Sequence, residues 1–155
     1  KTEVLEYKGN GNILITGSVG EVMEESIKVI VSFVKSHYKY NLNNVDLHFH
    51  FLDATTKKDG PSAGLSIAVA LLSMLEKKTI GEDIAFTGEV SLNGSILKVG
   101  GLKEKLIGAY NENIKIVYIP KSNFSDLEEI PKEIKESLEI VEVENFDEVY
   151  TKFFK

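Results

Sequence analysis

The sequence predicts a single domain of the α+β (mixed α/β) class that spans residues 1–155. Stretches that alternate apolar and polar residues, typical of strands, are interspersed with stretches in which apolar residues recur at helical spacing. The pair Asn93-Gly94, between two apolar runs, adds a tight hairpin to this mixture. A chain of this length buries roughly 70% of the surface of its unfolded state, so it can form a substantial core.

The first half of the chain is predicted to hold strands around one long helix. Residues 1–16 contain two short strands separated by Gly9-Asn10-Gly11-Asn12, a run with turn chemistry. Residues 20–38 carry apolar side chains near helical spacing. Residues 45–51 alternate strictly, which predicts a strand with Val45, Leu47, Phe49 and Phe51 on one face and Asp46, His48 and His50 on the other.

The second half is predicted to continue with a buried helix and a hairpin. Residues 55–61 form a polar loop, and residues 62–76 form a helix that is apolar nearly all round and therefore buried. The further elements are a strand over 84–88, a hairpin over 90–99, a helix over 102–112, a strand over 115–119, short helices near Asp126 and from Pro131, a strand over 138–143, and a last helix from Phe146.

Composition narrows the classes of function. The net charge is −6, and the 18 Lys residues form no basic stripe, so a nucleic-acid site is not predicted. The absence of Cys excludes a disulfide framework, Cys-ligated zinc and a thiol nucleophile. The longest mostly apolar stretch, Ala63 to Leu75, is too short for a bilayer span. Because Lys1-Thr2-Glu3 shows neither an initiator Met nor a signal-peptide pattern, we expect a fragment of a longer protein.

The run Lys58-Asp59-Gly60-Pro61-Ser62-Ala63-Gly64 delivers a serine to the start of the buried helix. Backbone N–H groups of a first helical turn lack intrahelical partners, and they would stabilise an oxyanion formed when Ser62 attacks a carbonyl. The small residues Gly60, Ala63 and Gly64 leave room for a substrate backbone. A serine that merely caps the helix fits the same pattern, so this run alone does not establish a nucleophile.

A nucleophilic serine needs a base, and the sequence offers histidines. Because the chain contains His37, His48 and His50, a Ser-His-Asp triad stays open. His48 and His50 share a strand face with Asp46, but no Cys or carboxylate cluster completes a metal site, and none is predicted. We expect these two histidines to line a polar surface or to support a neighbouring site.

Lysine is the other candidate base, provided that burial or nearby positive charge lowers its pKa. The run from Val99 to Ala109 offers Lys103 and Lys105. The small residues Gly108 and Ala109 leave slightly more space around Lys105, whereas a solvated charged helix face would explain both lysines without catalysis.

Other serine motifs are coincidental. Ser32-x-x-Lys35 and Ser95-x-x-Lys98 match the S-x-x-K pattern, but the accompanying S-D-N and K-T-G motifs are missing. The sequence also has no G-x-S-x-G elbow and no G-x-x-x-x-G-K-[ST] phosphate loop, so no Walker-type ATP site is predicted.

Taken together, the runs resemble the proteolytic domain of Lon proteases, in the bacterial and mitochondrial branch. The resemblance covers residues 9 to about 150 and is highly specific as a joint pattern. It is carried by the nucleophile run 58–64 and by four further segments: Gly17 to Ser26, Phe86 to Val90, Gly100-Gly101-Leu102-Lys103-Glu104-Lys105, and Ile119 to Asn123.

The resemblance implies a Lon-type fold of twisted mixed sheets, hairpins and packed helices, and a Ser-Lys catalytic dyad. Ser62 would be the nucleophile and Lys105 the general base. Thr87 would orient the Lys105 amine, and Asp59 would affect the resting arrangement of the site. Backbone N–H groups near Gly60 to Ser62 would hold the oxyanion, and His48 would lie near the site.

The resemblance also implies an ATP-dependent, usually hexameric protease of misfolded and regulatory proteins. This domain would need no cofactor, because ATP and Mg would bind an ATPase module N-terminal to it. The expected location is the cytoplasm or, alternatively, the mitochondrial matrix.

The sequence departs from the family at the loop before Ser62. Leu52-Asp53-Ala54-Thr55 replaces a frequent Pro-Glu-Gly-Ala run, and Lys57 replaces a frequent Pro, which puts the substrate preference in question. An N-terminal strand of the family's domain is also expected to be missing or cut short at Lys1. A non-catalytic Lon-like scaffold or peptide-binding module is the alternative function, against which the retention of both Ser62 and Lys105 argues.

Overall fold

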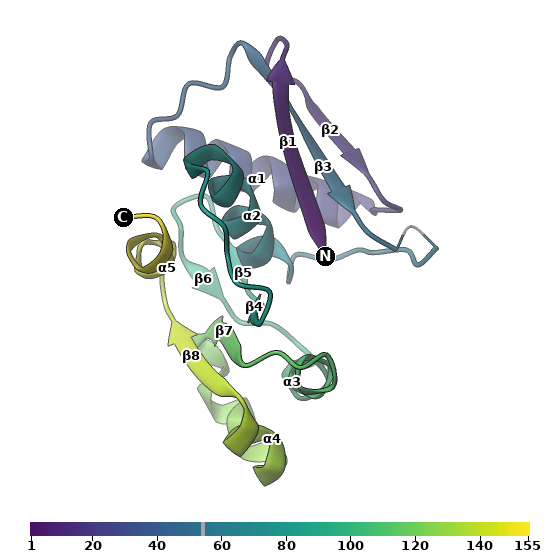
Figure 1. Cartoon of the computed structure of the whole chain (residues 1–155), viewed down its shortest axis with the longest axis vertical. Helices are drawn as coiled ribbons and strands as arrows, with labels where there is room; N and C mark the ends of the chain where they lie inside the picture. The colour runs from purple at the N-terminus through teal and green to yellow at the C-terminus, as the bar shows by residue number, and fades with distance from the viewer. Residues whose placement is uncertain (54) are drawn as a thin grey trace.

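The computed structural model describes residues 1–53 and 55–155, and its helices and strands are mixed along the chain (Figure 1). Ala54, in the loop that departs from the family pattern, lies outside the described residues. The predicted α+β class is confirmed. The elements are β1 (Thr2–Lys8), β2 (Ile13–Thr16), α1 (Glu21–His37), β3 (Val45–Phe51), α2 (Gly64–Glu76), β4 (Ile84–Phe86), β5 (Glu89–Val90), β6 (Ile96–Leu97), α3 (Leu102–Asn111), β7 (Ile116–Pro120), the 3₁₀ helix η1 (Lys121–Glu129), α4 (Lys132–Ser137), β8 (Glu139–Val143) and α5 (Phe146–Phe153).

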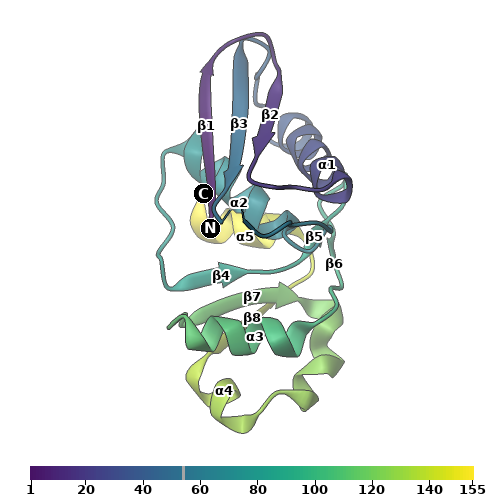
Figure 2. The same ribbon diagram turned by 90° about the vertical axis from the view of Figure 1, so that its right-hand side faces the viewer.

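The first sheet has the strand order β1-β3-β2, with β3 antiparallel to β1 and parallel to β2. The two N-terminal strands therefore do not pair with each other across their turn. The turn is instead held to β3, because Asp46 Oδ1 accepts hydrogen bonds from the N–H groups of Asn10 and Asn12, both at 2.9 Å. The alternate residues Leu47, Phe49 and Phe51 of β3 are buried in one hydrophobic cluster with residues of α1 and α2, as the strict alternation predicts. Figure 2 shows this sheet beside α1 and above α2.

The second sheet is parallel, with the order β4-β7-β8, and it separates two hydrophobic clusters. One face, which includes Phe86, Tyr118 and Val143, belongs to the large cluster that contains α1, α2 and α5. The opposite face, which includes Val117 and Ile119, packs against α3, α4 and η1. Figure 2 shows α2 and α5 on one side of this sheet and α3 and α4 on the other.

The predicted hairpin at Asn93-Gly94 is present, but its strands are short. Val90 pairs with Ile96, and the turn is tightened by the hydrogen bond from the Gly94 N–H to the Ser91 carbonyl, at 3.0 Å. Gly94 has a φ of +87°, a conformation that glycine adopts without strain.

Helix α2 begins at Gly64, two residues later than predicted, because the backbone around its start is held by a neighbouring segment. The Gly88 N–H donates to the Ser62 carbonyl at 2.9 Å, and the Leu65 N–H donates to the Gly88 carbonyl at 2.8 Å. We call this pair of hydrogen bonds the Gly88 clamp. From there on the helix is buried as predicted, with Leu65, Ile67, Ala68, Leu71 and Leu72 fully inaccessible.

Within residues 1–53 and 55–155, no helix combines the length and the apolar character that crossing a bilayer requires.

The close approach at the start of α2 predicts the effect of Gly64→Ala. A Cβ at Gly64 would lie 3.0 Å from the Val90 backbone nitrogen and 3.3 Å from the Gly88 carbonyl oxygen. We expect this overpacking to lower the free energy of unfolding by roughly 1–3 kcal/mol, measured by urea denaturation.

The matched control is Gly108→Ala, because a Cβ at this other helical glycine has open space around it. Alanine is the better helix former, so Gly108→Ala should raise the free energy of unfolding by about 0.5–1 kcal/mol. A Gly64→Ala chain as stable as wild type would show that the start of α2 is not tightly packed against Gly88.

Candidate active site

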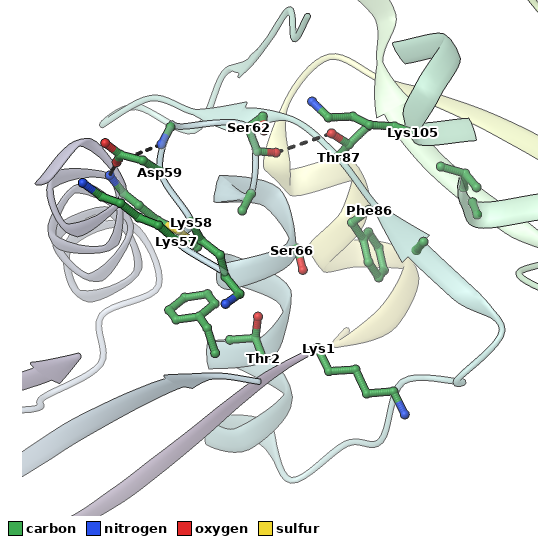
Figure 3. Close-up of a pocket in the computed structure, with 17 residues that line it drawn as sticks. Lys1, Thr2, Lys57, Lys58, Asp59, Ser62, Ser66, Phe86, Thr87 and Lys105 are labelled. Atoms are coloured by element: carbon green, nitrogen blue, oxygen red, sulfur yellow. Dashed lines mark hydrogen bonds between the residues drawn. The ribbon is translucent and has the colours of Figure 1, made fainter. Parts of the chain in front are cut away.

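The start of α2 opens into a pocket of about 560 Å³ to which separate elements contribute side chains. Ser62 and Lys105 both line it, 43 positions apart in the chain. The sequence-predicted residues Asp59, Gly60 and Thr87 line it as well (Figure 3). Five of the six predicted site residues therefore lie around one cavity, and His48 does not.

The loop before Ser62 is fastened to the start of α1. Lys58 and Val19 form an isolated parallel β-bridge. The Gly20 N–H donates a hydrogen bond to the Lys58 carbonyl, and the Lys58 N–H donates one to the Ser18 carbonyl, both at 2.8 Å. A side chain at Gly20 would collide with the Asp59 carboxyl group, at 2.4 Å from Cγ. The loop can therefore approach α1 this closely only because position 20 is a glycine.

Asp59 uses its carboxylate to cap α1. Its Oδ1 accepts hydrogen bonds from the Met23 N–H at 3.0 Å and from the Gly60 N–H at 2.9 Å. The bond from Met23 is the largest cause of a lowered Asp59 pKa, followed by the bond from Gly60. The carboxylate is exposed, and its negative charge lies at the positive end of a helix, which favours the ionised form further.

The same bond changes which backbone groups can hold an oxyanion. The Gly60 N–H is occupied by Asp59, and Pro61 has no N–H. In the described part of the chain, no acceptor is found for the N–H groups of Ser62 and Ala63. Of the backbone N–H groups expected to hold an oxyanion, those near Gly60 to Ser62, this structure leaves that of Ser62. The N–H group of Ala63, also at the positive end of α2, is a further donor.

Lys105 and Lys103, which sequence alone could not separate, differ in environment. Lys103 is exposed and does not line the pocket, whereas Lys105 is half-buried and does. Burial lowers the pKa of Lys105 from its usual value of 10.5. The Lys105 ammonium donates a hydrogen bond to the Gly100 carbonyl at 2.9 Å, so the amine of this structure is held by its own helix start.

The start of α3, which carries Lys105, is anchored by a buried asparagine. Asn123 is fully inaccessible; its Oδ1 accepts from the Val99 N–H at 3.0 Å and its Nδ2 donates to the Val99 carbonyl at 2.8 Å. This side chain replaces a strand partner for Val99, directly before Gly100 and Gly101. Lys105 is therefore placed by η1 as well as by its own helix.

Thr87 is 8% exposed and lies between the two candidate dyad residues in Figure 3. Its hydroxyl donates to the Ser62 carbonyl at 3.5 Å, and its N–H donates to the Tyr118 carbonyl at 3.0 Å. The bond expected from resemblance, to the Lys105 amine, is not made in this geometry, because that amine donates to Gly100. An orienting role of Thr87 toward Lys105 stays a prediction.

The histidines lie outside the pocket. The Thr16 hydroxyl contacts His48 Nε2 and His50 Nδ1, each at 2.8 Å, on the exposed face of the first sheet. His37 pairs with Asp147 at 3.0 Å on the surface. Residues 1–53 and 55–155 contain no group of three or more His, Cys, Asp or Glu residues that could hold a metal ion. The geometry thus gives no support to a His-based triad.

Sequence reasoning missed most of the apolar wall of the pocket. Met23, Phe51, Phe86 and Val117 line it, and a second serine, Ser66, lies one turn beyond Ser62. They come from five different elements, so no local pattern brings them together. Phe51 had the one usable signal, because the strict alternation in 45–51 assigns its side chain to the buried face.

Comparison with known proteins identifies the family of this chain. The family model described as the Lon protease (S16) C-terminal proteolytic domain matches residues 1–155. Lon protease of Mesomycoplasma hyopneumoniae is 40% identical over 99% of this chain and 18% of its own length. Lon protease of Haemophilus influenzae is 45% identical over 95% of this chain and 19% of its own length.

The chain thus spans about a fifth of the length of these relatives. The match of the family model over the whole chain and the identity to these relatives lead to one assignment. This chain belongs to the family of Lon protease (S16) C-terminal proteolytic domains.

Proposed function

We propose that this chain is a serine endopeptidase in which Ser62 is the nucleophile and Lys105 the general base. The proposal is carried by one observation: a serine at the start of a helix and a lysine whose pKa is lowered by burial line the same pocket. A lysine can act as a base near neutral pH only when its ammonium form is disfavoured, and burial has that effect.

The proposed reaction is acyl transfer. The neutral Lys105 amine leaves the Gly100 carbonyl and accepts the proton of the Ser62 hydroxyl while Oγ attacks the peptide carbonyl. The N–H groups of Ser62 and Ala63 hold the oxyanion. The Lys105 ammonium then gives its proton to the leaving amine, and the same base activates the water that hydrolyses the acyl-enzyme.

The walls of the pocket serve this chemistry in two ways. Met23, Phe51, Phe86 and Val117 offer an apolar surface to a substrate side chain, which suits an unfolded segment rather than a folded one. Lys105 lines the same pocket, where its burial disfavours the ammonium form and so lowers its pKa. Thr87 and Asp59 would act as supporting residues, by contacting the Ser62 carbonyl and by holding the preceding loop.

For the whole protein we propose an ATP-dependent protease of misfolded and regulatory proteins, assembled as a homo-hexamer in the cytoplasm or, alternatively, the mitochondrial matrix. Membership of the family supports this proposal. ATP and Mg would bind another module of a longer chain. The 155 residues contain no G-x-x-x-x-G-K-[ST] run that would fit ATP, and no step of the reaction above requires it.

Ser62→Ala should abolish cleavage of a fluorogenic peptide and covalent labelling by a serine-reactive probe mapped by mass spectrometry. We expect kcat to fall by at least about 10³-fold, because removing the nucleophile leaves only the binding and oxyanion contributions. The matched control is Ser66→Ala, since this serine also lines the pocket. Cleavage retained in pure Ser62→Ala would overturn the assignment, and loss in Ser66→Ala instead would move it one turn along the helix.

Lys105→Ala should reduce cleavage as severely as Ser62→Ala and should abolish labelling of Ser62. Lys105→Arg should also be inactive, because a guanidinium stays protonated at any working pH. Lys103→Ala is the control, two positions earlier on the same helix but exposed, and it should keep activity within about twofold of wild type. Labelling of Ser62 that survives Lys105→Ala would keep the nucleophile and reject the base.

The pH profile of kcat/KM tests the protonation state of Lys105. Because the base must be neutral, activity should rise about tenfold per pH unit below its pKa and level off above it. The inflection must lie below 10.5, since burial lowers the pKa of Lys105 from that value. A kcat/KM that shows no rise at any pH below 10.5, or that falls with increasing pH, would contradict a lysine base. Peptide binding without cleavage at any pH would favour the non-catalytic scaffold.

A further inference from the structure

We propose that Lys57 selects substrates that carry an acidic residue on the N-terminal side of the bond to be cleaved. This inference rests on the proposed function and adds the substrate class to it. Its basis is the charge of the pocket, the contacts of each charged group there, and the position of Lys57 relative to the dyad.

The pocket is basic although the chain is acidic. The net charge of the chain is −6, yet the lining includes Lys1, Lys57, Lys58 and Lys105 against one carboxylate among the described residues, that of Asp59. A cleft lined by one sign of charge concentrates field and attracts groups of the opposite sign. The pocket therefore favours substrate carboxylates, unlike most of the surface around it.

Two of these charges are already engaged by the protein. Asp59 accepts the N–H groups of Met23 and Gly60, so its carboxylate is directed at the start of α1. The Lys58 ammonium donates to three backbone carbonyls, those of Gly17 at 3.2 Å, Thr56 at 2.9 Å and Asp53. Lys58 therefore holds the loop together and has no donor left for a substrate.

Two others do not suit a substrate carboxylate. Lys105 must be neutral at the moment of reaction, and Figure 3 shows the Lys1 side chain directed away from Ser62. Lys57 is exposed, lines the pocket, and makes no hydrogen bond or ion pair with any residue that the structure describes. Its charge is near the exposed Asp59 carboxylate and is a lesser cause of the lowered pKa of that group, but the Lys57 ammonium keeps all its donors. It is the cation that remains available to a bound peptide.

The position of Lys57 determines which part of the peptide it meets. Figure 3 places Lys57 and Asp59 on one side of Ser62 and Lys105 on the other. Because the Lys105 ammonium gives its proton to the leaving amine, the segment C-terminal to the scissile bond lies on the Lys105 side. The acyl segment, N-terminal to that bond, then extends past Lys57.

The test compares three peptides that differ at one position N-terminal to the cleaved bond, which carries Glu, Gln or Lys. Solvent-exposed ion pairs contribute little, so we expect kcat/KM for the Glu peptide to exceed that for the Lys peptide by roughly fivefold. The difference should lie in KM rather than kcat, because the contact is remote from the reacting atoms. The ratio of kcat/KM for the Glu peptide to that for the Lys peptide should approach one at about 1 M salt, where charges are screened within about 3 Å.

Variants of the chain assign the effect to Lys57. Lys57→Gln should bring the Glu-to-Lys ratio close to one, Lys57→Glu should invert it, and Lys57→Arg should retain it. The control is Lys28→Gln, an equal change of charge at an exposed position of α1 outside the pocket, which should keep the wild-type ratio. A ratio near one in wild type, or a ratio that Lys57→Gln leaves intact, would overturn the inference while leaving the peptidase standing.

A binding measurement keeps the inference testable if no peptide is cleaved. Fluorescence anisotropy of the same labelled peptides with the wild-type chain and with Lys57→Gln reports affinity without chemistry. A Lys57-dependent preference for the Glu peptide, without cleavage, would support selection of acidic peptides by Lys57 and would count against the proposed peptidase. Equal affinity for all three peptides, or no detectable binding of any of them, would reject the inference.

Discussion

The Gly88 clamp is the constraint on which the rest of the site depends. One residue donates to the Ser62 carbonyl and accepts from the Leu65 N–H, so the start of α2 is fixed against the segment that follows β4. A clamp this close requires glycine on both sides, because a Cβ at Gly88 would lie 2.9 Å from Ile96 and a Cβ at Gly64 would press on the Val90 backbone. Ser62 is held outside the helix for the same reason.

The clamp ties α2 to the segment that follows β4, a strand of the sheet that lies between two separately packed hydrophobic clusters. Helix α2 belongs to the large hydrophobic cluster, whereas α3, with Leu102 and Leu106, belongs to the small one. The sheet β4-β7-β8 lies between them and contributes one face to each. The geometry between Ser62 and Lys105 therefore depends on strand pairing and on the Asn123 anchor as much as on either helix. Changes far from the pocket that shift this sheet would alter the distance between nucleophile and base.

Charge in the site is arranged by competition between burial and hydrogen bonding. Burial disfavours the ammonium form of Lys105, whereas backbone N–H groups favour the ionised form of the exposed Asp59. The two neighbouring lysines of the loop differ in their partners as well. The Lys58 ammonium donates its hydrogen bonds to backbone carbonyls, whereas the Lys57 ammonium donates none within the described residues. A basic pocket on an acidic chain is thus built from a few groups whose partners are specified by the loop conformation.

Local sequence patterns were sufficient for the class, order and approximate bounds of the elements. The strand at 45–51, the helix near 20–38 and the turn at Asn93-Gly94 all follow from periodicity and turn chemistry, which act within a few residues. They also presented Ser62 at the start of a buried helix and Lys105 next to Lys103 as candidates. The choice of that pair came from the resemblance to a known family rather than from the residues alone.

Tertiary structure decided what depends on contacts between distant residues. It placed β3 between β1 and β2, where β3 pairs with both strands, and it separated Lys105 from Lys103 by burial. It engaged the Gly60 N–H, one of the expected oxyanion donors, in a hydrogen bond to Asp59. It also placed His48 in contact with Thr16, outside the pocket. The sequence by itself thus determined elements and candidate groups, since these follow from short-range spacing. Which candidates share one cavity depended on long-range packing, which no local pattern encodes.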